Sequence, residues 1–165
     1  EAFLDKMEAD IKKYESQNKT GNKVLDTVLT TKSLYCAKHN ITFTCVADGT
    51  LLDFMDVMDI CSIFGNALDN AITAVMKVTD PDKRVVSTKL IIQSDLMVIQ
   101  VQNYYEGKLQ FEKGLPLTTK KNKADHGYGM KSIRYTAEKY NGTITVQTKN
   151  QIFMLQILIP VPNSA

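Results

Sequence analysis

The apolar residues in the first part of the chain recur every three or four positions, as they do on one face of a helix. They form two stripes: Phe3, Met7, Ile11 and Tyr14, then Val24, Val28, Thr31 and Tyr35. Thr20-Gly21-Asn22 lies between the stripes. Glycine and asparagine weaken a helix interior, so we expect residues 1–40 to form a helix that is kinked or divided near Gly21.

Beyond residue 40 the pattern switches between the period of a strand and that of a helix. The predicted elements are a strand at 41–47, a turn at 48–49, a helix at 53–78, strands at 88–94 and 96–103, a helix at 127–140 entered through glycines, and strands at 143–148 and 152–160. Pro81 forbids continuation of the long helix. Asn141-Gly142 is typical of a hairpin or a helix cap.

The helices cluster beside strands without strict alternation of strand, helix and strand. This order predicts an α/β fold, a two-layer sandwich in which helices cover one face of a mixed sheet and the N-terminal helix forms an arm. The length of 165 residues suits one ordinary domain with a short appendage. We expect residues 1–38 to be the appendage and residues 39–165 to be the domain.

Composition and charge exclude several classes of function. A net charge of +2 is too small to indicate a nucleic-acid partner, and the lysine run at 120–123 has no interleaved aromatic residues. Cys36, Cys45 and Cys61 fit no zinc or disulfide pattern, which is typical of reduced thiols in a cytosolic setting. No apolar run is long enough to span a bilayer. Because the chain begins with Glu1, we interpret it as a fragment of a longer protein.

Two asparagines interrupt the apolar stretch GNALDNAITAV. Asn66 and Asn70 are spaced i,i+4 and therefore share one face of the predicted helix. Asparagine is a mediocre helix former, so its presence there needs a reason. Amide oxygens suit hard cations such as Mg²⁺, which shares phosphate oxygens with a few protein ligands. The alternative is a cap or a buried amide network, and the pair alone favours that alternative.

Two further stretches are candidates for ligand contacts. HGYGM, from His126 to Met130, places Gly127 and Gly129 where backbone N–H groups of a helix start could meet an anion. Lys120 and Lys121 precede it and could compensate phosphate charge. VQNYYEG ends a β-rich run with Asn103, which is placed to read the edge of a base or is simply a turn residue.

Together, in this order, the motifs resemble the GHKL ATP-binding fold, also called the Bergerat fold. IFGNALDNAITAV resembles the N box of histidine kinases, and HGYGMKSI resembles their G2 box. GLPLTTKKNKADHGYGM and the entry segment TGNKVLDTVLTTKSLYCAKHNITF are similar to kinases of the AgrC type, the peptide-pheromone quorum-sensing receptors. The resemblance extends from about residue 18 to the C-terminus.

The resemblance implies a role for each candidate residue. Asn70 becomes the Mg²⁺ ligand, Asn66 lies near the phosphates of ATP, and Asn103 faces adenine in place of the usual aspartate. The remaining nucleotide contacts it implies are Lys120, Lys121, His126, Gly127, Tyr128, Gly129 and Met130. For Tyr128 and Met130, packing in the core is the more common outcome. ATP-hydrolysing relatives carry a glutamate base at the Asn66 position, and an amide cannot accept that proton.

The implied function is the catalytic domain of a two-component sensor histidine kinase. It would transfer the γ-phosphoryl of ATP to a histidine on an upstream dimerisation helix, of which residues 1–38 are the tail. Partners would be this helix, a response regulator and a second copy in the full-length protein. The location would be the cytoplasmic side of a membrane-anchored receptor. His39 is better explained as a helix-end residue than as the phosphoacceptor.

Two other functions stay open from the sequence. The first is a GHKL-shaped docking module that binds nucleotide poorly, because the segment around Asn103 lacks the usual glycines. The second is an ATPase or a serine protein kinase of the same fold. Asn66 argues against hydrolysis, since no carboxylate stands at that position to activate water.

Overall fold

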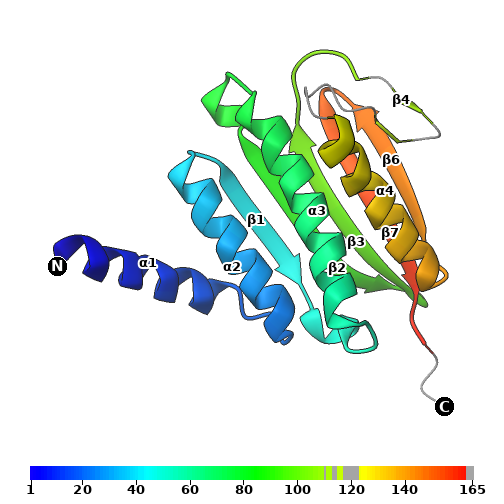
Figure 1. The fold of residues 1–165 in the computed structure, drawn as a ribbon, viewed down its shortest axis with the longest axis horizontal. Coiled ribbons are helices and arrows are strands. Elements are labelled where there is room, and N and C mark those ends of the chain that lie inside the picture. The colour runs from blue at the N-terminus through cyan, green and yellow to red at the C-terminus, as the bar shows by residue number, and fades with distance from the viewer. Residues whose placement is uncertain (110, 113–114, 117–122, 163–165) are drawn as a thin grey trace.

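The computed structural model describes residues 1–109, 111–112, 115–116 and 123–162, with the backbone alone at 111–112, 115–116 and 123–128. A five-stranded sheet forms one layer, and the helices α2, α3 and α4 cover one of its faces (Figure 1). Helix α1 extends away from these layers as an arm (Figure 1). The predicted two-layer α/β sandwich with an N-terminal arm is confirmed.

The sheet has the strand order β1-β2-β3-β7-β6. Its strands are β1 (Thr42–Ala47), β2 (Val85–Gln93), β3 (Leu96–Tyr104), β6 (Thr143–Lys149) and β7 (Ile152–Pro160). β1 and β2 are parallel, whereas β2–β3, β3–β7 and β6–β7 are antiparallel, so the sheet is mixed as predicted. The strands β4 (Phe111–Glu112) and β5 (Leu115–Pro116) pair separately.

The helices are α1 (Ala2–Gln17), α2 (Lys23–Lys38), α3 (Val57–Met76) and α4 (Lys123–Lys139), with short 3₁₀ helices η1 (Gly49–Leu52) and η2 (Pro81–Lys83). The predicted division near Gly21 is confirmed. Gly21 has a φ of 97°, a conformation that glycine adopts without strain. The side chain of Asn22 accepts a hydrogen bond from the Leu25 amide at 3.0 Å and so caps α2.

Two predicted helix starts are wrong. Helix α3 begins at Val57 rather than residue 53, because Asp56 caps it by accepting a hydrogen bond from the Met58 amide at 2.9 Å. Helix α4 begins at Lys123, four residues before Gly127. Gly127 and Gly129 therefore lie inside the helix and do not precede it. A helix packed on a core tolerates interior glycines, since packing supplies most of its stability.

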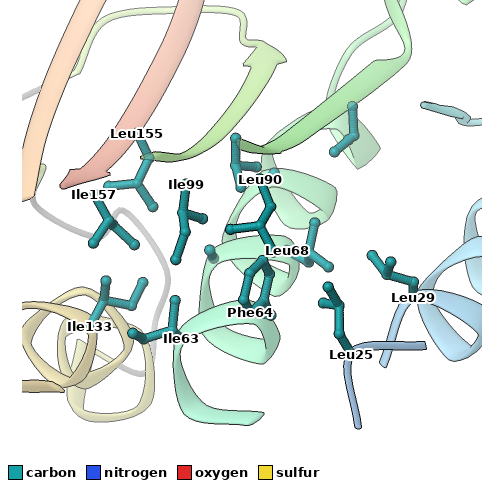
Figure 2. Close-up of a cluster of buried hydrophobic side chains, with 14 of the residues drawn as sticks. Leu25, Leu29, Ile63, Phe64, Leu68, Leu90, Ile99, Ile133, Leu155 and Ile157 are labelled. Atoms are coloured by element: carbon teal, nitrogen blue, oxygen red, sulfur yellow. The ribbon is translucent and has the colours of Figure 1, made fainter. Parts of the chain in front are cut away.

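The core lies between the helices and the sheet, and α2 belongs to it. Leu25 and Leu29 of α2 face Phe64 and Leu68 of α3, while Ile63 faces Ile133 of α4 (Figure 2). No residue of α1 is buried. The domain core thus includes a helix from within the range 1–38.

The predicted apolar stripe of α2 is wrong by one position. The buried residues of α2 are Leu25, Leu29, Thr30, Ser33 and Cys36, whereas Thr31 and Tyr35 of the predicted stripe are exposed. Valine and leucine stand side by side at 24–25, so periodicity alone does not select the face that packs. None of the helices in the described part of the chain combines the length and apolar character needed to cross a bilayer.

Candidate functional site

Asn66 and Asn70 lie on the side of α3 that meets α4. Both side chains are partly exposed, between the buried residues Ala67, Leu68 and Ala71 that hold α3 on the core. Buried residues extend along α3 from Ile60 to Val75, so the two amides project from a rigid support. The predicted placement of both asparagines on one helix face is confirmed.

The Asn66 amide is part of a short hydrogen-bonded chain between the two helices. Its Nδ2 donates to Ser62 Oγ at 3.4 Å, and Ser62 Oγ lies 3.0 Å from Ser132 Oγ of α4. Its Oδ1 is directed toward Gly129, where an added Cβ would lie 3.7 Å from that oxygen. A Cβ at Gly129 would thus make an ordinary van der Waals contact with this oxygen, so the Asn66 carbonyl lies beside α4 at Gly129.

The Asn70 amide contacts the same helix. Its Nδ2 donates to Met130 Sδ at 3.4 Å. Met130 is only 4% exposed and packs in the core, which is the alternative that the sequence favoured for this residue. Its sulfur is thus held in place beside Asn70.

Asn103 lies at the end of β3, on the face of the sheet that the helices cover. Asn103 continues the series of buried residues Met97, Ile99 and Val101, because every second side chain of a strand points to the same face. The side chain is 4% exposed, and its Nδ2 donates to the Tyr104 carbonyl oxygen at 2.9 Å. Asn103 is therefore a fixed polar group at the edge of the core.

The segment after Asn103 is tied down by neighbouring turns. Glu106 accepts hydrogen bonds from the Thr79 amide and hydroxyl, both at 2.8 Å, and these bonds lower the pKa of the Glu106 carboxyl. Gln151 Nε2 donates to the carbonyl oxygen of Tyr105 at 3.2 Å. The contacts of Glu106 and Gln151 fix the position of the segment that follows Asn103.

The three asparagines share one arrangement. In each of them Nδ2 donates a hydrogen bond to another group of the protein. None of the three Oδ1 atoms has a hydrogen-bond partner among the residues described. A carbonyl oxygen accepts hydrogen bonds and binds hard cations. The oxygens of Asn66 and Asn70 are therefore suited to a hard cation or its water ligands, and the oxygen of Asn103 is suited to a hydrogen-bond donor.

The other predicted contacts divide into two groups. Lys120 and Lys121 lie outside the described residues, as do the side chains of His126 and Tyr128. Gly127 and Gly129 lie on α4. The sequence reasoning missed Ser62 and Ser132, since a single serine on a helix carries no signal until the two helices are paired in space.

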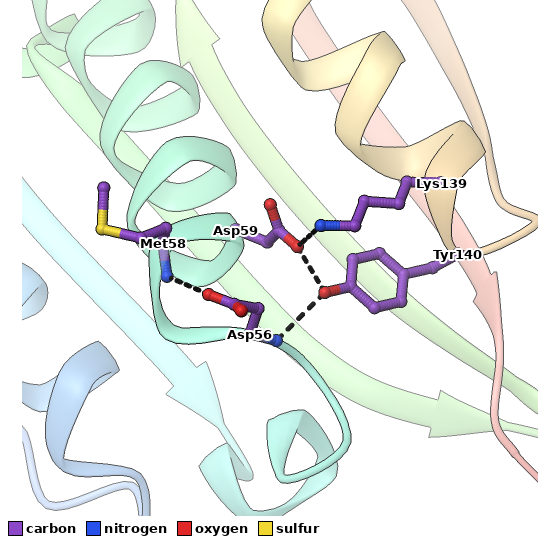
Figure 3. Close-up of polar contacts among 5 residues, drawn as sticks. All are labelled: Asp56, Met58, Asp59, Lys139 and Tyr140. Carbon is purple, nitrogen blue, oxygen red and sulfur yellow. Dashed lines mark hydrogen bonds and ion pairs between the residues drawn. The ribbon is translucent and has the colours of Figure 1, made fainter.

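A polar cluster joins the first turn of α3 to the last turn of α4 (Figure 3). Asp59 accepts a hydrogen bond from Lys139 Nζ at 2.8 Å and another from the Tyr140 hydroxyl. The Tyr140 hydroxyl also accepts from the Asp56 amide at 3.0 Å. These contacts lower the pKa of Asp59, whereas desolvation and the bond to Asp59 raise the pKa of Tyr140. The cluster fixes the relative position of the two helices that carry the site.

Comparison with known proteins identifies the family. A family model described as a GHKL domain matches residues 55–160, more than half of the chain. This chain is a GHKL domain. The match includes α3, β3 and α4, and hence all three asparagines of the site. A comparison with curated proteins found no match.

Solved structures share the fold of this GHKL domain. The histidine kinase AdeS of Acinetobacter baumannii matches with a TM-score of 0.57 and 14% identity, over 85% of this chain and 64% of the AdeS chain. The catalytic domain of histidine kinase ThkA matches with a TM-score of 0.63 and 18% identity, over 86% of this chain and 95% of that one. A second ThkA structure gives a TM-score of 0.59 and 17% identity, over 84% of this chain and 92% of that one. The fold is thus that of histidine kinase catalytic domains.

Proposed function

We propose that this GHKL domain is the ATP-binding catalytic domain of a two-component sensor histidine kinase of the AgrC type. The observation that carries the proposal is the common arrangement of Asn66, Asn70 and Asn103, which all keep a carbonyl oxygen unpartnered among the described residues. ATP would lie between α3 and α4, with adenine toward Asn103. Family membership and the shared fold support this reading.

In the proposed mechanism Asn70 would hold Mg²⁺, and Asn66 would orient a water ligand or a phosphate oxygen beside it. Bound Mg²⁺ would compensate the charge of the phosphates. The Asn103 oxygen would accept a hydrogen bond from the adenine amino group. Lys120, Lys121 and His126 would add positive charge near the phosphates, where charge compensation and positioning supply most of the rate.

The γ-phosphoryl would pass to a histidine nitrogen on a dimerisation helix that precedes this domain. The bond from the γ-phosphorus to the bridging oxygen breaks, a nitrogen–phosphorus bond forms, and ADP leaves. Asn66 supports transfer over hydrolysis, because an amide cannot take the proton of an attacking water. The phosphohistidine would then pass its phosphoryl group to an aspartate of a response regulator. The domain would lie on the cytoplasmic side of a membrane-anchored receptor.

Titration calorimetry of ATP into this chain tests the proposal. We expect saturable binding that strengthens with Mg²⁺, and an altered Mg²⁺ dependence in an Asn70→Asp variant, since the substitution adds a charge at the proposed ligand. Asp69→Asn, an exposed neighbour on the same helix, is the control and should bind as the parent does. Absence of saturable binding at millimolar ATP would contradict the proposal and favour a docking module. Steady phosphate release without an acceptor protein would favour an ATPase.

A further inference from the structure

Side chains that have no part in the proposed chemistry hold the amides of Asn66 and Asn70 in one orientation. The two contacts come from different helices: Ser62 lies one turn before Asn66 on α3, and Met130 lies on α4 beside Asn70. We infer that Ser62, Ser132 and Met130 are positioning residues that turn the carbonyl oxygens of Asn66 and Asn70 toward the metal and phosphates. This inference rests on the proposed function.

The orientation of an asparagine amide decides whether it attracts or repels a cation. Rotation of the amide by half a turn exchanges the oxygen and the NH₂ group with almost no change in shape. The oxygen is a ligand for Mg²⁺, whereas the NH₂ hydrogens carry positive charge toward it. A neutral site built from two asparagines therefore needs partners that favour one orientation.

For Asn66 the partner is a hydroxyl pair. Ser62 Oγ accepts from Asn66 Nδ2 at 3.4 Å and shares a second hydrogen bond of 3.0 Å with Ser132 Oγ. Either serine can donate in that second bond, and where Ser62 donates to Ser132 its lone pairs stay available to Asn66 Nδ2. The Asn66 oxygen is left on the side of Gly129. Helix α4 thus determines the direction of an amide on α3.

For Asn70 the partner is a thioether. A thioether sulfur accepts hydrogen bonds but cannot donate them, so Met130 Sδ selects the NH₂ group and not the oxygen. Because Met130 is 4% exposed, the core holds this sulfur in position. Groups that orient metal ligands in this way typically change metal affinity by about 10- to 100-fold when they are removed.

The chain offers a matched control for each variant. Ser33 Oγ accepts from Asn18 Nδ2 at 3.2 Å in a buried contact on α2, so Ser33→Ala removes a similar bond away from the site. Met154 Sδ accepts from Gln102 Nε2 at 3.2 Å on the opposite face of the sheet, so Met154→Leu matches Met130→Leu. Leucine keeps the volume of methionine and removes the sulfur.

The test is titration calorimetry of ATP into the parent and each variant, once with Mg²⁺ and once with EDTA. We expect Ser62→Ala, Ser132→Ala and Met130→Leu to weaken Mg²⁺-dependent binding by about 10-fold or more, with little change in EDTA. Ser132→Thr keeps the hydroxyl and should bind as the parent does. Ser33→Ala and Met154→Leu should also bind normally.

The possible failures are distinct. If the parent does not bind Mg²⁺-ATP, the proposed function is wrong. If the parent binds and the three variants show the same Mg²⁺ dependence, the positioning role is wrong and the proposed function stands. Equal losses in the control variants, or equal losses with Mg²⁺ and with EDTA, would assign the effect to stability and would also overturn the positioning role.

Discussion

At the scale of single residues, the neighbours of each asparagine in the site determine how its side-chain amide is oriented. Its amide carries a donor and an acceptor, and this protein uses the donors of Asn66, Asn70 and Asn103 on a hydroxyl, a thioether and a backbone carbonyl. The acceptors stay available among the described residues. A carboxylate at any of these positions would accept hydrogen bonds at both of its oxygens and could act as a base. The amides provide a polar site that is poorly suited to activating water.

Two glycines allow a matched test of local packing. A Cβ at Gly142 would lie 2.6 Å from the Leu158 carbonyl oxygen and 2.7 Å from Ile159 Cγ1. We expect Gly142→Ala to lower the free energy of unfolding by about 1–3 kcal/mol, because the backbone must move. Gly65→Ala adds its Cβ to open space inside α3 and should raise the free energy of unfolding by about 1 kcal/mol. Urea unfolding measures both, and effects of the same sign would contradict this explanation.

At the scale of elements, the antiparallel pair α3 and α4 builds the site. Contacts run along the whole pair, from Asn70–Met130 through Ser62–Ser132 to Asp59–Lys139. Asp59 lies in the first turn of α3 and Lys139 in the last turn of α4, so each charge also suits the dipole of its own helix. The Asp59 cluster fixes one end of the pair and thereby the register of the serines and asparagines.

The Asp59 cluster predicts a pH dependence of stability. Hydrogen bonds from Lys139 and Tyr140 lower the pKa of Asp59 in the folded state below its usual value of 3.8. Its contribution is therefore complete above about pH 4 and is lost as the pH falls through the folded-state pKa. We expect Asp59→Asn to destabilise the protein at pH 7 and to differ less from the parent at pH 3.

Urea unfolding at the two pH values measures this difference. Glu138→Gln is the control, an exposed acid on α4, the helix that carries Lys139. Its effect should be small at both pH values. An Asp59→Asn variant that loses as much stability at pH 3 as at pH 7 would show that the cluster acts by packing rather than by charge.

At the scale of the whole molecule, three helices and a sheet form one core, and α1 contributes nothing buried to it. Helix α2 lies in this core through Leu25 and Leu29. Packing therefore separates α1 from the rest of the chain at residues 18–22, before the division at residue 38 that the sequence suggested. In the proposed receptor, α1 would be the part that continues toward the dimerisation helix.

Two shortened chains test this organisation. A chain that begins at Asn18 lacks α1. It should unfold cooperatively, with nearly the same free energy of unfolding as the parent chain. A chain that begins at Asn40 also lacks α2 and exposes its contacts with Phe64 and Leu68. Each fully buried leucine contributes about 1.5–3 kcal/mol, so loss of Leu25 and Leu29 should leave this chain largely unfolded. Circular dichroism and urea unfolding distinguish the two; equal stability would contradict the packing.

The order of elements followed from the sequence because periodicity, prolines and caps are local properties. The i,i+4 spacing put Asn66 and Asn70 on one face, and Asn141-Gly142 correctly predicted the end of α4, where Asn141 has a φ of 62°. The strands predicted at 88–94 and 96–103 follow each other directly in the sequence, and they pair as the antiparallel strands β2 and β3. Each of these features depends on residues within a few positions of one another.

Only the tertiary structure decided which face of α2 is buried, where α4 begins and which groups orient the asparagines. Adjacent apolar residues at 24–25 leave two helical faces almost equally apolar, and the packing against α3 selects one. Ser62 and Ser132 are 70 positions apart, and Met130 is 60 positions from Asn70. A local pattern cannot encode such pairs, because the contact exists only after the helices pack. The sequence by itself determined which residues could form the site, and the packing of α4 on α3 determined which of their atoms are available for binding.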